Sequence, residues 1–151
     1  MNAPARSTPP AWKARLSVFA AALWWGSLSV TGFLAVPTLF ASLPTPALAG
    51  SVAARLFSAQ GWVAVACGML LLFVSRSEDG RCGMDWRGGA VLFILTGLLL
   101  ALLSEFAVAP RIMARENLRL WHGLGTAMYV GQWLCAGVVL WKLTTTRAGE
   151  A

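Results

Sequence analysis

Residues 88–109, GGAVLFILTGLLLALLSEFAVA, contain a single charged side chain, that of Glu105. A helix needs about 20 apolar residues to cross the hydrocarbon core of a bilayer. The chain has four runs of about this length or longer, and we expect spans at about 16–41, 53–74, 88–109 and 121–143. Because lipid offers no partner to backbone N–H and C=O groups, each span must be helical. The sequence therefore predicts an all-α integral membrane protein, a four-transmembrane-helix bundle.

The overall composition also favours a membrane protein. Of 151 residues, 58% are apolar and only 12% are charged. A soluble domain of this size could not cover its surface with so few charges. The net charge of +6 does not indicate nucleic acid, because the basic residues stand in short clusters between the apolar runs. We expect the lipid bilayer as a partner and no nucleic acid.

The chain divides into a flexible tail at 1–14, a membrane domain at 15–143 and a short tail at 144–151. Four crossings place both tails on one side. That side, with the middle loop, carries eight Lys and Arg residues, against four on the other side. Since basic loops stay in the cytoplasm, both termini are predicted to be cytoplasmic. Arg exceeds Lys beside abundant Ala and Gly, which favours a bacterial inner membrane.

The first run leaves a second interpretation open, that of a cleaved signal peptide. Residues 45–49 resemble a small-residue cleavage site before Gly50. The apolar run is about twice as long as that of a signal peptide, and Trp24 and Trp25 lie in its middle. A spanning helix is the preferred interpretation.

A short motif recurs in the first and third spans. Phe33-Leu-Ala-Val-Pro37 has its counterpart in Phe106-Ala-Val-Ala-Pro110. Many membrane folds are built from repeats, so the motif suggests two related helical hairpins. A chance match is an equal alternative in a chain this rich in Ala and Val.

Small residues follow helical spacing in every span, and they are expected to pack the helices together. Helices in lipid associate through close packing of small residues and through interhelical hydrogen bonds. The expected stripes are Ala22, Gly26 and Ser29; Gly61, Ala64 and Gly68; Gly97, Ala101 and Ser104; and His122, Gly125, Tyr129, Gln132 and Ala136.

Polar side chains near the outer ends of the spans form a candidate pocket. Glu105 is the only acidic residue within a span, and ionisable groups at membrane depth are functional candidates. The alternative is that Glu105 is hydrated or paired with Arg55 or Arg111, and that His122 is interfacial. The predicted polar outer cluster comprises Arg55, Gln60, Glu105, His122, Tyr129 and Gln132.

The tryptophans divide into two groups by depth. Indoles are enriched at membrane interfaces, while a deep indole prefers a polar partner and a neighbouring helix. Trp24, Trp25 and Trp133 are expected to pack between helices. The expected interfacial anchors are Trp12, Trp86, Trp121 and Trp141.

The three cysteines lack the spacing of a disulfide framework or zinc site. Cys67 and Cys135 fall inside apolar runs and are expected to act as small packing residues. Cys82 is predicted to be cytoplasmic and reduced. No nucleotide loop, nucleophile elbow or metalloprotease motif is present in the sequence. We therefore expect no enzymatic activity, no catalytic residue, no metal and no cofactor.

Five short segments together resemble the transmembrane protein 205-like family, also known as domain of unknown function 4149. They are residues 23–27, 36–40, 49–50 followed by 55–57, 108–111 and 121–124. The resemblance implies a small four-helix membrane protein without an established reaction. That family often has Asn where this chain has Tyr129. The motif residues here are Trp25, Gly26, Pro37, Phe40, Gly50, Phe57, Pro110, His122 and Gly123.

Three functions are compatible with these features. The first is a noncatalytic membrane module that packs with itself or with another membrane protein. The second is a small transporter or permeation subunit with the polar cluster at its outer mouth. The third is a redox or haem-linked module, in which His122 would have to act across a dimer because the chain has one His.

Overall fold

The computed structural model describes residues 11–75, 86–114 and 117–148, and these residues form helices with no strand among them. The elements are α1 (Ala11–Val30), the π-helical segment η1 (Thr31–Ala35), α2 (Val36–Ser42), α3 (Pro46–Ser75), α4 (Trp86–Leu103), the π-helical segment η2 (Ser104–Val108), α5 (Ala109–Met113) and α6 (Leu118–Ala148).

Four long helices result, because α1, η1 and α2 run on as one rod and α4, η2 and α5 as another. All four are long and apolar enough to cross a membrane. The predicted four-helix transmembrane bundle is confirmed. The helices extend beyond the expected spans. Residues 11–14, which were assigned to the flexible tail, are helical, and α6 continues to Ala148, past the expected end at residue 143. Residues 1–10 of the predicted tail lie outside the described residues.

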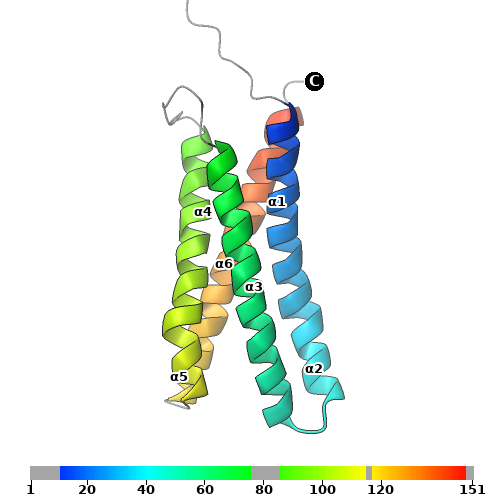
Figure 1. Cartoon of the computed structure of the whole chain (residues 1–151), viewed down its shortest axis with the longest axis vertical. Helices are drawn as coiled ribbons and strands as arrows, with labels where there is room; N and C mark the ends of the chain where they lie inside the picture. Colours follow the sequence, from blue (N-terminus) through cyan, green and yellow to red (C-terminus); the bar gives the residue numbers. More distant parts are fainter. Residues whose placement is uncertain (1–10, 76–85, 115–116, 149–151) are drawn as a thin grey trace, which may run out of the picture.

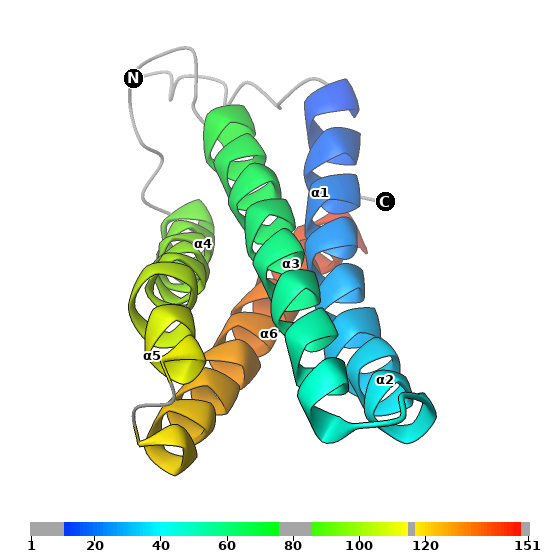
Figure 2. The same ribbon diagram turned by 60° about the horizontal axis from the view of Figure 1, so that its bottom comes forward.

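The helices pack in the cyclic order α1, α3, α4, α6, and α6 closes the ring against α1. Figures 1 and 2 show the four rods side by side, with α6 inclined behind α3. Helices adjacent in sequence are therefore adjacent in space, as short connections favour. The start of α1 and the end of α6 lie at the same end of the bundle (Figure 1).

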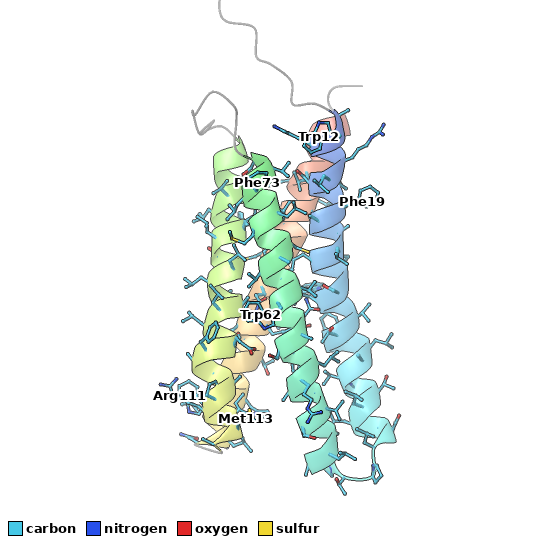
Figure 3. The ribbon with its side chains drawn as sticks, viewed as in Figure 1. Trp12, Phe19, Trp62, Phe73, Arg111 and Met113 are labelled. Atoms are coloured by element: carbon cyan, nitrogen blue, oxygen red, sulfur yellow. The ribbon has the colours of Figure 1, made fainter. Side chains whose placement is uncertain are left out.

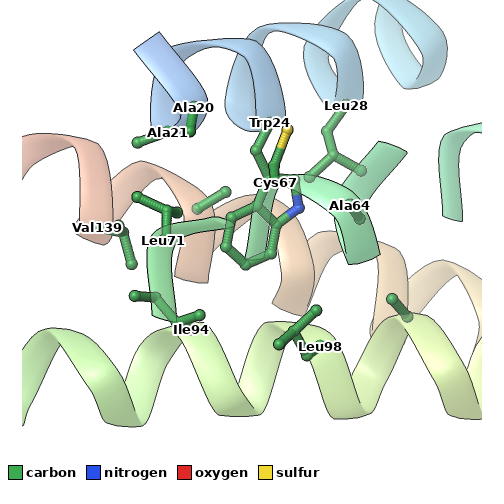
Figure 4. Packing of buried hydrophobic residues seen from close by; sticks show 12 residues of the cluster. Ala20, Ala21, Trp24, Leu28, Ala64, Cys67, Leu71, Ile94, Leu98 and Val139 are labelled. Carbon is green, nitrogen blue, oxygen red and sulfur yellow. The ribbon is translucent and has the colours of Figure 1, made fainter. Parts of the chain in front are cut away.

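The core is a tight apolar layer in the half of the bundle where α1 begins. Trp24, Leu28 and Val139 are fully buried there, and Figure 4 shows Trp24 between α1, α3 and α4. Glycines leave the space that two buried side chains, Trp24 and Leu98, occupy. A Cβ at Gly97 would lie 2.7 Å from the Trp24 ring, and one at Gly68 would lie 2.6 Å from Leu98. At these two places the helices approach closely because the glycines carry no side chain.

The two π-helical segments stand at equivalent places in the recurring motif. Pro37 and Pro110 each follow one such segment, and a proline removes a donor and clashes with the carbonyl four residues earlier. The helix widens by one residue instead: the Val36 N–H bonds the Thr31 oxygen, and the Ala109 N–H bonds the Ser104 oxygen. The prolines account for this shared geometry, and the two related helical hairpins stay a prediction.

The small-residue stripes divide between the inside and the outside of the bundle. Ala64, Gly68 and Ala101 face the core, as expected. The expectation for α1 is wrong in part. Ala22 is exposed, and nothing lies within 4 Å of a Cβ at Gly26. Trp24 and Leu28 take the inward face of α1 together with Ala20 and Ala21, so Ala22 and the open side of Gly26 face outward.

The deep tryptophans pack between helices, as predicted, but the expected polar partner is missing for Trp24, whose Nε1 is buried without a hydrogen bond among the described residues. Trp24 is fully buried, and the rings of Trp25 and Trp133 lie 5.8 Å apart between α1 and α6. Trp12 at the start of α1 and Trp141 near the end of α6 are exposed, and Figure 3 shows Trp12 at the end of the bundle. Both therefore stand where interfacial anchors are expected. The side chain of Trp86 lies outside the described part of the structure.

Candidate functional site

A hydrogen-bonded polar layer crosses the bundle near the middle of α3. The Gln60 amide is buried, and its two polar atoms bond to α1 and to η1. Its Nε2 donates to Ser27 Oγ at 3.0 Å, and its Oε1 accepts from Thr31 Oγ1 at 3.3 Å. Thr31, the first residue of η1, is also buried. A buried amide is stable in an apolar bundle when its polar atoms have partners.

Aromatic residues of α6 bind the same stretch of α1 from the other side. The Tyr129 hydroxyl donates to the Leu28 main-chain oxygen at 2.7 Å, and Trp133 Nε1 donates to Ser29 Oγ at 2.8 Å. The Tyr129 ring packs edge-on against Phe57 of α3, with centroids 5.2 Å apart. One turn of α1 is thus held by hydrogen bonds from both α3 and α6.

Glu105 lies apart from this layer, in η2 at the seam between α3 and α4. Its Oε1 accepts a 2.5 Å hydrogen bond from Ser58 Oγ, and the residue is half-buried. Glu105 stands eight residues before Met113, the last residue of α5, which is about 12 Å along a helix. The carboxyl group therefore lies within the apolar part of its span.

The basic residues suggested as partners of Glu105 form no ion pair with it in the described part of the structure. Arg111 donates to the Ala107 oxygen at 2.6 Å and lies over the Trp121 ring, 4.6 Å from its centroid. Arg55 is exposed. Within residues 11–75, 86–114 and 117–148, Glu105 makes no ion pair. Within the described residues, the hydrogen-bond partner of the Glu105 carboxyl group is therefore the neutral Ser58 hydroxyl.

The six residues of the predicted polar cluster do not converge on one pocket. Gln60 and Tyr129 reach the same stretch of α1, and Gln132 is buried on α6. Glu105 is bonded to Ser58 at the α3–α4 seam. Arg55 and His122 are exposed side chains. A ligand-binding role for the cluster as a whole stays a prediction.

Sequence reasoning missed the hydroxyl partners Ser27, Thr31 and Ser58. Serine and threonine are common in membrane helices and usually bond to their own backbone, as Ser17 does here. No pattern in the sequence separates these three hydroxyls from those that bond within their own helix. No group of three or more metal-ligating side chains occurs among the described residues. Cys67 and Cys135 are buried and free, while Cys82 lies outside the described residues.

The family model described as DUF4149, a domain of unknown function, matches residues 19–120. The chain belongs to this family. The matched part of this DUF4149 protein includes both π-helical segments, Gln60 and Glu105. It ends just before His122 and Gly123, so these two motif residues lie outside it. No curated protein and no solved structure matches the chain.

Several family-motif residues have clear structural roles in this DUF4149 chain. Pro37 and Pro110 each lie two residues after the end of a π-helical segment. Trp25 packs on Trp133 and stands 3.1 Å from a Cβ built at Gly137. Phe57 packs against Tyr129. Phe40 and His122 are exposed, and Gly26, Gly50 and Gly123 have open space around a Cβ.

Proposed function

We propose that this DUF4149 protein is a noncatalytic multi-pass membrane module that works by packing against a second copy of itself. A different membrane protein as the partner is the alternative outcome. The observation that carries the proposal is the lipid-facing small-residue face of α1. A Cβ at Gly26 would have no neighbour within 4 Å, whereas the space beside Gly68 is occupied by Leu98 and the space beside Gly97 by Trp24.

A glycine on a lipid-facing surface does nothing for packing inside the protomer. It does allow another helix backbone to approach closely, which is how helices associate in lipid. Ala22 is exposed one turn before Gly26, so the two form a small-xxx-small pair. Large exposed side chains, among them Phe19 and Val30, flank this pair along the helix, so the pair forms a shallow depression between them.

The interior of the bundle also favours packing over permeation. Trp24, Leu28 and Val139 fill the axis in one half. The polar groups of the middle layer are used in helix-to-helix hydrogen bonds, such as that from Gln60 to Ser27. A permeation path along the axis of a single bundle would require these packed side chains to move and these hydrogen bonds to break. This arrangement supports a static scaffold.

Self-association can be tested by energy transfer between labelled copies in liposomes at decreasing protein-to-lipid ratio. Gly26→Leu should weaken association about tenfold, since it fills the gap needed for close approach. Gly50→Leu is the matched control, because its Cβ also has open space but stands at the start of α3. Equal association of wild type and Gly26→Leu would exclude this face. A monomeric wild type would direct the search to another protein.

We also propose that the protein lies in a bacterial inner membrane with both termini in the cytoplasm. Lys13, Arg15 and Lys142 stand at the end of the bundle where α1 begins and α6 ends. Basic residues on one side favour that side as cytoplasmic. The five motif segments support kinship with the transmembrane protein 205-like members in particular.

A small transporter or permeation subunit is the second candidate, favoured by the Glu105 carboxylate within a span. Transport would then follow the outside of the bundle or an interface between copies, since the axis is filled. Uptake into proteoliposomes that is unchanged in Glu105→Gln would contradict this role for the residue.

A further inference from the structure

We draw no further inference here: the strongest candidate, the cavity of about 70 Å³ between the four helices at the end of the bundle where α1 begins, has mainly apolar walls, and nothing in the described part of the structure shows what occupies it.

Discussion

The Tyr129 hydroxyl of α6 donates a hydrogen bond to the Leu28 main-chain oxygen of α1, and its ring lies against Gly32, where a Cβ would stand 2.7 Å from the ring. Tyr129 therefore reaches across to α1 beside η1 and holds the two helices together through one hydrogen bond and one ring contact.

Tyr129→Phe is expected to lower the free energy of unfolding by about 0.6 kcal/mol, and at most about 1.7 kcal/mol, the range for interhelical hydrogen bonds in membranes. Gly32→Ala should cost more, because the added methyl group collides with a rigid ring. Reversible unfolding in mixed detergent measures both. In a double-mutant cycle, Tyr129→Ala should relieve much of the Gly32→Ala penalty. Additive effects would contradict the contact.

Gly97→Ala is expected to destabilise the bundle by about 1–3 kcal/mol, the usual cost of overpacking. The reason is that the new Cβ would lie 2.7 Å from two carbons of the buried Trp24 ring. Gly50→Ala is the control: its Cβ meets nothing within 4 Å, and alanine is the better helix former. Thermal unfolding followed by near-ultraviolet circular dichroism should show a lower midpoint for Gly97→Ala alone.

Gln60→Leu should lower stability by about 1 kcal/mol, because two interhelical hydrogen bonds, to Ser27 and from Thr31, are lost. Gln60→Glu has the same shape but places a second carboxyl group at membrane depth, so it should cost more. Unfolding by sodium dodecyl sulfate compares the two. A Gln60→Leu variant as stable as wild type would show that the polar layer contributes little to helix packing.

The orientation can be checked with a membrane-impermeant maleimide. In a variant without Cys67 and Cys135, the natural Cys82 between α3 and α4 should be labelled only from the cytoplasmic side. Thr45→Cys, in the connection between α2 and α3 of a fully cysteine-free variant, should be labelled only from outside. The reverse pattern would show that the count of basic residues misassigned the sides. Intact spheroplasts and inverted vesicles provide the two preparations.

Much of the fold could be predicted from the sequence, while the site could be predicted only in outline. The four spans followed from run length, because hydrocarbon thickness fixes the number of apolar residues. Gln60, Glu105 and Tyr129 stood out as polar groups within the spans. Their partners did not, because a hydrogen bond from Gln60 to Ser27 depends on how two helices are rotated about their axes. Apolar periodicity is weak in helices that face lipid on one side and a core on the other.

The sequence by itself determined that the chain is a helical membrane protein with four spans, since twenty apolar residues leave the backbone no other structure in lipid. It also placed two prolines at equivalent depths. Only the tertiary structure decided which face of each helix lies inside. Trp24 turns inward and Gly26 outward because the Trp24 ring fits the space left by Gly97. That choice depends on shape across helices, and residue type along one helix does not contain it.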